Sequence, residues 1–266
     1  MPEARPLLDT APRLQFDTKL YRVTVTHITS NSQGDLNINL EYRQMYVTHP
    51  TDHLSENPVS AFSNNRAKAR EARLKPGDWL FFEGDEVEWL YLIKSGVIRL
   101  TRMLENGRRQ VISFGYPGDI IGFPADGLHH TDCESLTIAR LQPIRRAHLE
   151  SGRDDPTMHR ALLQSALHEI CSMQDHFMML GRKSATERLT SFLYVLSERV
   201  GKKLDSGYEI HLPMSRADIA DFLGLATETV SRTFTQLRMS KVIEIENIQT
   251  IIIPNPEMLL DLSLQD

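Results

Sequence analysis

The sequence predicts an α+β fold, in which a strand-rich half precedes a long helix and a small helical domain with a strand-rich tail. Three observations indicate this order. Short apolar runs broken by Gly and Asp start at residue 74, an apolar stripe spans residues 157–183, and two short helical patterns flank Gly224. We therefore expect four segments, at residues 1–66, 67–152, 153–183 and 184–266.

The composition is that of an ordinary globular protein. The chain has 266 residues, of which 41% are hydrophobic and 24% charged, enough for two modest domains. Its two cysteines, Cys133 and Cys171, provide no disulfide framework and indicate a reducing cytoplasm. The first ten residues lack the apolar core of a signal peptide, and no apolar run approaches the ~20 residues that span a membrane. We therefore expect a cytoplasmic location and no membrane partner.

The first segment, residues 1–66, predicts a β-hairpin and a linker. Residues 21–28 alternate between apolar and polar, and so do Leu36, Ile38 and Leu40, with the turn-forming run NSQG between them. Residues 49–65 are polar and rich in turn formers, as linkers are. A mobile arm without function is the alternative.

The second segment consists of short strands. Its apolar stretches lie in LKPGDWLFFEGD, YLIKSGVIRLTRMLENGRRQVISF and GDIIGF, and such close spacing is typical of a barrel or sandwich. Asn106 and Gly107 predict a two-residue hairpin turn, because both tolerate positive φ. We expect an exposed hairpin tip formed by Glu105, Arg108, Arg109 and Gln110.

The third segment predicts one long helix with a dimer seam. Spacings of three and four residues alternate along its apolar positions, which are Leu163, Ala166, Ile170, Met173, Phe177 and Leu180. This a/d pattern over nearly three heptads is typical of a two-stranded coiled coil, and it contains no buried charge. The alternative is a core helix packed against its own domain.

The fourth segment predicts a helix-turn-helix motif. In the first helix Ile219, Ala220 and Leu223 share one face, and Ser215 is a plausible N-cap. In the second helix the residues expected to face inward are Val230, Phe234 and Leu237. Two short helices joined by a tight turn containing glycine define this motif, whose second helix enters the DNA major groove.

Further elements complete this domain. A helix at residues 185–200 has one apolar face, formed by Leu189, Phe192, Leu193 and Leu196. Strands are expected at residues 208–212, 242–246 and 250–253, which together would form a wing. Pro254 and Pro256 end the last strand, and one or two helical turns are expected at residues 258–264.

The outward face of the second helix has the chemistry to read DNA bases. It presents Glu228, Ser231, Arg232 and Thr235. Arg donates two hydrogen bonds to guanine O6 and N7, and Glu accepts one from cytosine N4. Glu228 and Arg232 are four residues apart, so they are neighbours that could read both partners of one G·C pair. Taken alone, such a pair is more commonly a salt bridge on a solvated helix.

The motif MSRADIADFLGL at residues 214–225, followed by ETVSR at residues 228–232, resembles the DNA-binding signature of the Crp/Fnr superfamily of bacterial transcription regulators. The resemblance covers roughly residues 74–264, and is greatest for the FixK-like branch. It implies a β-roll sensor domain related to cyclic-nucleotide-binding domains, a dimerisation helix and a C-terminal winged helix-turn-helix. The positions that match the family's base-reading residues are Glu228, Ser231 and Arg232.

The resemblance also implies partners and a DNA sequence. These are double-stranded DNA, bound by a homodimer, and RNA polymerase, contacted by the hairpin tip. Members resembling the cAMP receptor have Arg where this chain has Thr227, which predicts TTGAT rather than TGTGA half-sites in an inverted repeat. FixK-like members tend to activate genes for life at low oxygen. Arg216 and Lys241 are the candidates for phosphate contacts.

Two features of the chain bear on DNA affinity. The net charge is −5, so we expect binding to depend on a few placed cations, with a modest dependence on salt. The residue that opens the recognition helix is Ala226, where the family usually has Ser or Thr. Loss of that N-cap costs about 1 kcal/mol, and Thr227 could cap instead, which would shift the helix start by one residue.

We expect no cofactor and no metal. Iron–sulfur members have a cysteine cluster near the N-terminus, whereas no cysteine precedes Cys133 here. The run at residues 118–141 lacks the Glu and Arg with which other members hold a cyclic phosphate. His129, His130 and Cys133 make an incomplete metal site, so a polar surface loop is expected. Cys171 is expected to be a structural thiol, with a redox switch as the alternative.

Two other functions compete with this interpretation. In one, the β-roll binds haem or a small molecule such as a 2-oxo acid, and DNA binding requires that effector. The other is an enzyme, which no motif supports: the sequence has no Gly-rich phosphate loop, no HExxH and no nucleophile elbow.

Overall fold

The computed structural model describes residues 24–30, 36–42, 70–124 and 126–264, which form two units, Met1–Arg43 and Gln44–Asp266. In the first unit β1 (Thr24–Ser30) and β2 (Leu36–Tyr42) pair antiparallel, as the alternation predicts. The linker predicted at residues 49–65 lies outside the described residues.

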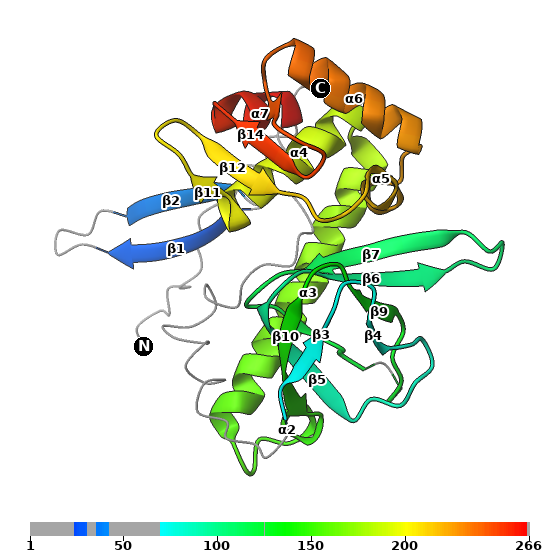
Figure 1. Ribbon diagram of the computed structural model, residues 1–266. Coiled ribbons are helices and arrows are strands. Elements are labelled where there is room, and N and C mark those ends of the chain that lie inside the picture. The colour runs from blue at the N-terminus through cyan, green and yellow to red at the C-terminus, as the bar shows by residue number, and fades with distance from the viewer. Residues whose placement is uncertain (1–23, 31–35, 43–69, 125, 265–266) are drawn as a thin grey trace, which may run out of the picture. The chain divides into compact units, whose positions relative to one another are not determined.

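Two four-stranded antiparallel sheets form the β-roll of the second unit (Figure 1). The first sheet has the order β3 (Ala72–Leu74), β10 (Ala139–Arg145), β5 (Trp89–Ser95) and β8 (Ile120–Ile121). The second has the order β4 (Trp79–Phe81), β9 (Asp132–Ser135), β6 (Ile98–Met103) and β7 (Arg109–Gly115). Asn106 and Gly107 lie in the turn that joins β6 to β7, but the predicted two-residue turn is wrong. The Leu104 amide donates to the Arg108 carbonyl, so Glu105 also lies inside the loop, and of the two predicted residues Gly107 alone has a positive φ, of 76°. The short helix α2 (Ala147–Glu150) follows β10.

The long helix α3 (Pro156–Arg182) begins one residue before the apolar pattern at residues 157–183. Asp155 caps it by accepting a hydrogen bond from the Met158 amide, and Pro156 occupies the first turn, where a missing N–H is harmless. Met158 and Leu162 are fully buried and pack against Leu90 of the β-roll. The first half of the helix is therefore part of the β-roll core.

The C-terminal domain is a winged helix-turn-helix. Its helices are α4 (Ala185–Val200), α5 (Arg216–Leu223), α6 (Thr227–Met239) and α7 (Pro256–Ser263). Its sheet has the order β11 (Lys202–Lys203), β12 (Tyr208–His211), β14 (Thr250–Ile253) and β13 (Glu244–Ile245). Within the described ranges, no helix is both long enough and apolar enough to cross a bilayer.

Two predicted boundaries in this domain are wrong, and one strand was not predicted. Helix α7 starts two residues earlier than expected, because the fixed φ of Pro256 suits the first helical position and Asn255 caps the helix. The strand expected at residues 242–246 is shorter, because Val242 and Ile243 turn into the core before the chain pairs. The sequence pattern also missed β11, which consists of two exposed lysines.

A single apolar core joins the C-terminal domain to the β-roll. Phe114 of β7 lies with its ring centroid 5.3 Å from that of Phe222 on α5 and 6.3 Å from that of Phe192 on α4. Val111 and Tyr116, also from the β-roll, belong to the same buried cluster. The helix-turn-helix is therefore packed directly on β7.

Candidate DNA-binding site

Helix α5 and the turn that follows it are held by local interactions. The Ser215 hydroxyl accepts a hydrogen bond from the Asp218 amide at 3.1 Å, and the Asp218 carboxylate accepts one from the Ser215 amide at 2.9 Å. This capping box confirms Ser215 as the N-cap. The helix ends at Gly224, whose φ of 63° lies in the left-handed region that glycine adopts without strain.

Helix α6 presents the face that the sequence predicts. Val230, Phe234 and Leu237 are buried, and Glu228 and Arg232 are exposed. Ser231 and Thr235 are exposed on the same side. The arrangement leaves a polar helix face open to a ligand as large as a DNA duplex.

The start of α6 resolves the question of its N-cap. Ala226 occupies the cap position without a side-chain hydrogen bond, and Thr227 is the first residue of the helix. The alternative in which Thr227 caps the helix is therefore wrong. Glu228 lies in the first turn, where an acidic side chain interacts favourably with the helix dipole and compensates in part for the missing cap.

Glu228 and Arg232 form an ion pair on the exposed face. Arg232 Nη2 lies 2.6 Å from Glu228 Oε1, and the two side chains are 79% and 73% exposed. The Ser231 hydroxyl donates to the Thr227 carbonyl at 2.9 Å. Exposed i,i+4 pairs contribute less than about 1 kcal/mol, so contacts to base edges can replace this one at little cost.

The exposed face of α6 also includes residues that the sequence analysis did not identify. Gln236, Met239 and Ser240 line one shallow surface with Glu228 and Arg232. Gln236 is exposed, and its amide could pair with adenine N6 and N7. The helical spacing 228, 232, 236, 239 is the signal that could have identified them.

The two cations predicted to contact phosphate differ in their surroundings. Lys241 is exposed just after α6, in a left-handed conformation with a φ of 58°. The Arg216 guanidinium instead lies 3.4 Å from the centre of the Phe234 ring, and burial lowers its pKa to about 10. Arg216 stays charged at neutral pH but packs on its own domain, so the geometry favours Lys241. Arg238, exposed in the last turn of α6, is a cation that sequence reasoning missed.

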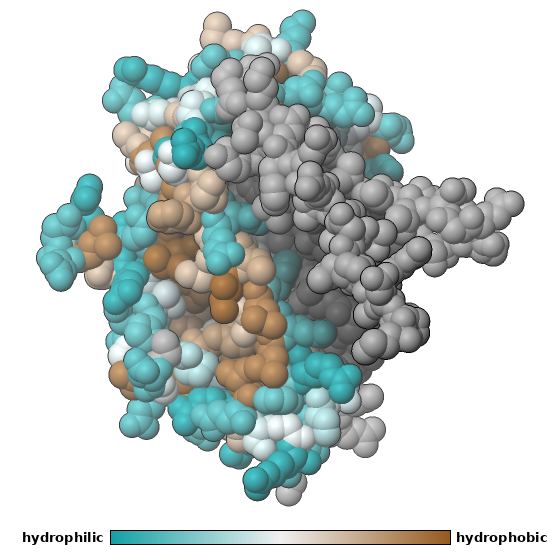
Figure 2. Space-filling model, turned by 180° about the vertical axis from the view of Figure 1, so that it is seen from behind, coloured by the Kyte–Doolittle hydropathy of each residue, from teal (hydrophilic) through white to brown (hydrophobic). Residues whose placement is uncertain are grey.

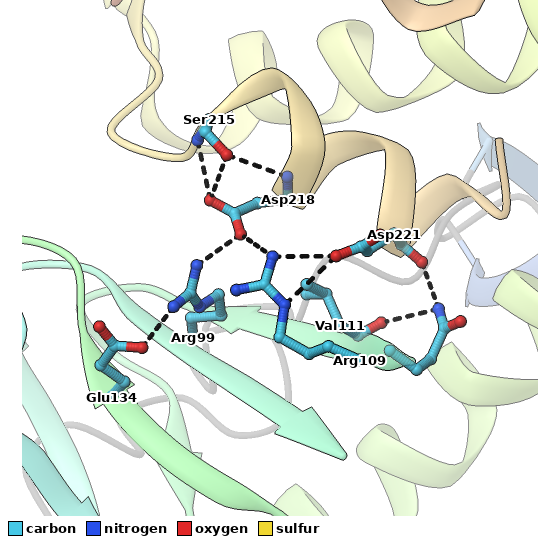
Figure 3. A network of polar contacts seen from close by, with 8 residues as sticks. Arg99, Arg109, Val111, Glu134, Ser215, Asp218 and Asp221 are labelled. Carbon is cyan, nitrogen blue, oxygen red and sulfur yellow. Dashed lines mark hydrogen bonds and ion pairs between the residues drawn. The ribbon is translucent and has the colours of Figure 1, made fainter. Parts of the chain in front are cut away.

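Two arginines of the β-roll hold helix α5 (Figure 3). Arg109 Nη2 on β7 lies 2.6 Å from Asp218 Oδ1 and 2.9 Å from Asp221 Oδ2. Arg99 on β6 pairs with both Asp218 and Glu134. We call these five residues the α5 clamp.

The α5 clamp has a defined electrostatic balance. Burial acts to raise the pKa of the Asp218 carboxyl, but hydrogen bonds from Ser215 and the charges of Arg99 and Arg109 outweigh it and hold the pKa below its usual value. The carboxylate therefore remains ionised, and it serves the helix cap and the clamp together.

The prediction that all four residues of the hairpin tip are exposed is wrong, because part of the tip contacts α5. Arg109 and Gln110 point to α5, and the Gln110 side-chain amide donates to the Asp221 backbone carbonyl. Of the four residues predicted for the tip, only Glu105 and Arg108 are exposed. The hairpin pattern showed which residues lie near the turn, but not that one side of it faces another domain.

Helix α3 exposes an apolar stripe. Ile170, Met173 and Phe177 are exposed by 52%, 50% and 75% of their surface. Leu163 is exposed on the same side, and apolar side chains gather on the face of the molecule shown in Figure 2. Leu167, which the a/d assignment passed over, is also exposed.

One residue of the predicted seam packs against another part of the fold, and a second is partly buried. Leu180 packs against the core of the C-terminal domain, and Ala166 is partly buried. The exposed stripe is therefore Leu163, Leu167, Ile170, Met173 and Phe177, which we call the α3 stripe. It ends one turn earlier than predicted, because the last turn of α3 contacts the C-terminal domain.

The polar surface loop predicted around His129, His130 and Cys133 is wrong for His129 and Cys133, which are buried, whereas His130 is exposed. The His129 ring stacks on Phe81 with centroids 3.6 Å apart, and burial lowers its pKa. Cys133 lies in β9 without exposure, and burial raises the pKa of its thiol, which makes it unreactive. Among the described residues no three His, Cys, Asp or Glu side chains converge as metal ligands. Cys171 is exposed on α3.

Known proteins share both halves of this architecture. Residues 71–151 match the cyclic nucleotide-binding domain family, and residues 187–262 match the Crp-like helix-turn-helix domain family. The nitrogen fixation regulation protein FixK of Rhizobium meliloti is 39% identical over 191 residues, which are 72% of this chain and 86% of that protein. The transcriptional activatory protein AadR of Rhodopseudomonas palustris is 34% identical over 196 residues, which are 73% and 78% of the two chains.

The structural comparison agrees. The structure of FixK2 from Bradyrhizobium japonicum has a TM-score of 0.68 at 30% identity, and the match covers 74% of this chain and 98% of that one. A β-roll joined by a long helix to an open helix-turn-helix defines a DNA-binding transcription regulator rather than an enzyme. The chain belongs to the Crp/Fnr family and is a FixK-like member of it.

Proposed function

We propose that this regulator is a homodimeric activator that binds an inverted repeat of TTGAT-type half-sites. The observation that carries the proposal is the exposed Glu228–Arg232 pair on α6, with Thr227 beside it. Glu228 and Arg232 would share the single G·C pair of the half-site, and Thr227 would place its methyl group against a thymine methyl. Ser231 would contribute a neighbouring base or phosphate contact.

The α3 stripe supports the homodimer. A row of exposed apolar side chains along a helix is costly in water, and an identical row on a second copy would cover it. A parallel pair of α3 helices would place two recognition helices about one DNA turn, roughly 34 Å, apart. An inverted repeat is the DNA counterpart of that two-fold symmetry.

Selection of bound DNA from a random pool, with purified protein and no added ligand, tests this function. We expect inverted repeats of TTGAT to be enriched. Enrichment of TGTGA, of single half-sites, or of no sequence would each contradict the proposal. A protein with this target would act in the cytoplasm, where bacterial DNA lies.

The match of residues 71–151 to cyclic nucleotide-binding domains favours one other candidate, an effector-dependent regulator. The same selection, repeated with cAMP and with haem, separates the two. Enrichment only after addition of one of these ligands would favour the effector-dependent function, and a visible absorption spectrum of the purified protein would show haem directly.

A further inference from the structure

Arg188, in the first turn of α4, joins the ends of two other helices. Its guanidinium donates to the carbonyls of Leu180 at 2.7 Å and Lys183 at 2.9 Å, at the end of α3. It also donates to the carbonyls of Leu223 at 3.0 Å and Gly224 at 3.4 Å, at the end of α5. One side chain thus links the last turn of the long helix to the turn of the helix-turn-helix.

The chemistry of this junction suits arginine. The last carbonyls of a helix have no partner within it, and together they carry a partial negative charge. A guanidinium is a planar cation with five N–H donors in a fixed fork, so it can satisfy carbonyls of two helix ends at once. An ammonium group has a compact charge and cannot span both ends in the same way.

Two further contacts place α3 against the same turn. The His176 ring stacks on Phe222 with centroids 4.5 Å apart. A Cβ built on Gly224 would lie 3.4 Å from Leu180 Cδ2, so the last turn of α3 lies directly against the turn that precedes α6. The α3 stripe reaches Phe177, one turn before this junction.

We infer that Arg188 is a positioning residue, which fixes the direction of the recognition helix relative to the α3 stripe. This inference rests on the proposed function, because the distance between half-sites matters only when two copies bind one inverted repeat. In such a dimer the stripe sets the symmetry axis and Arg188 transmits that geometry to α6. The protein should therefore prefer one half-site spacing, and this preference should depend on Arg188.

Binding to a series of duplexes tests the inference. Each duplex contains two TTGAT half-sites, either at the spacing that the wild type selects or with one base pair inserted or removed. One base pair moves a half-site by about 3.4 Å and turns it by about 35°, so a rigid dimer should lose affinity by roughly tenfold or more. The ratio measured is the affinity for the selected spacing divided by the affinity for an altered spacing. For Arg188→Met we expect this ratio to fall to about twofold or less, since α6 can then adapt to either spacing.

Two more variants make the test specific. Ile251→Ala opens a cavity on β14, which pairs with β12 and β13 and receives no hydrogen bond from Arg188, and it should weaken binding to every duplex by the same factor. Arg188→Lys keeps the positive charge without the planar guanidinium and should lower the affinity ratio by a smaller amount. If Arg188→Met does not fold, Arg188→Lys is the variant that tests the inference. Sedimentation of each variant verifies that it is dimeric before binding is measured.

The possible outcomes distinguish a failure of the inference from a failure of the proposed function on which it rests. A wild-type protein that discriminates spacing, with Arg188→Met and Arg188→Lys that discriminate equally well, overturns the inference even if overall affinity falls. A wild-type protein that binds all spacings alike overturns the proposed dimer on an inverted repeat, and the inference with it. A lowered ratio in the Arg188 variants alone supports the inference.

Discussion

Arg109 on β7 and Asp218 on α5 form an ion pair of 2.6 Å, although 109 positions separate them in the chain. Asp218 is also the acidic member of the capping box that starts α5. The same carboxylate therefore starts the first helix of the DNA-binding motif and fastens it to the β-roll.

The α5 clamp should contribute measurably to stability. Arg109→Ala should lower the free energy of unfolding by about 1 kcal/mol, because Arg99 still pairs with Asp218 and Arg109 is partly exposed. Arg109→Asp should cost more, since it places like charges together, and Asp221→Arg in the same chain should restore part of the loss. Urea unfolding of each variant measures these differences. Arg108→Ala, at the exposed turn, is the matched control and should change stability by less than about 0.5 kcal/mol.

The exposed turn itself is the remaining candidate for a polymerase contact. Glu105→Ala with Arg108→Ala should keep DNA affinity and lose transcription in a purified system, because exposed loops commonly carry partner contacts. Arg109 and Gln110 are left unchanged, since they hold α5. Unaltered transcription would show that the tip is only a turn.

The α3 stripe should form the dimer without any ligand. Ile170→Glu should yield a monomer, because it places like charges together in a desolvated seam. Thr157→Glu adds the same charge to the exposed first turn of α3, where an acidic residue is favourable, and should remain dimeric. Sedimentation at micromolar concentration measures both. A monomeric wild type would contradict the dimer.

Thr227 should decide between half-sites. Wild type should prefer TTGAT to TGTGA, and Thr227→Arg should shift the preference to the second, because Arg reads guanine bidentately. Changing the shared G·C pair should cost about 1–3 kcal/mol per half-site. Thr227→Ala removes the methyl group and should weaken the preference without reversing it. Competition binding at one fixed salt concentration measures this, and equal wild-type affinity for both duplexes would show that Thr227 does not discriminate.

His176 should make stability depend on pH. Burial against Phe222 lowers the pKa of its imidazole from 6.5 to about 4, so the unfolded chain takes up the proton first as pH falls. Stability is therefore full above about pH 6.5 and is lost as pH falls towards 4. Between pH 7 and 5 the loss due to His176 should be about 2 kcal/mol.

Urea unfolding of wild type and His176→Leu at both pH values isolates this effect, since the other histidines are common to the two proteins. His176→Leu should show a loss smaller by that amount. Equal losses in the two proteins would show that the unfolded and folded states bind the His176 proton alike.

The sequence by itself determined the helix-turn-helix of the DNA-binding domain. The inward face of α6, the Ser215 cap and the glycine turn followed from short-range spacing, because a helix repeats every 3.6 residues and its ends need particular side chains. The Glu228–Arg232 pair followed for the same reason, since residues four apart on a helix must be neighbours.

Only the tertiary structure decided what each face packs against. The residue pattern in the sequence placed Arg109 near an exposed turn, Leu180 on the dimer seam and Cys133 on a loop. In the structure all three lie against other parts of the fold. Periodicity shows which residues share a face, but burial also depends on contacts between distant segments, which no local pattern records. Arg188 shows this most clearly: in the sequence it is one cation of a helical first turn, and in the fold it joins the ends of α3 and α5.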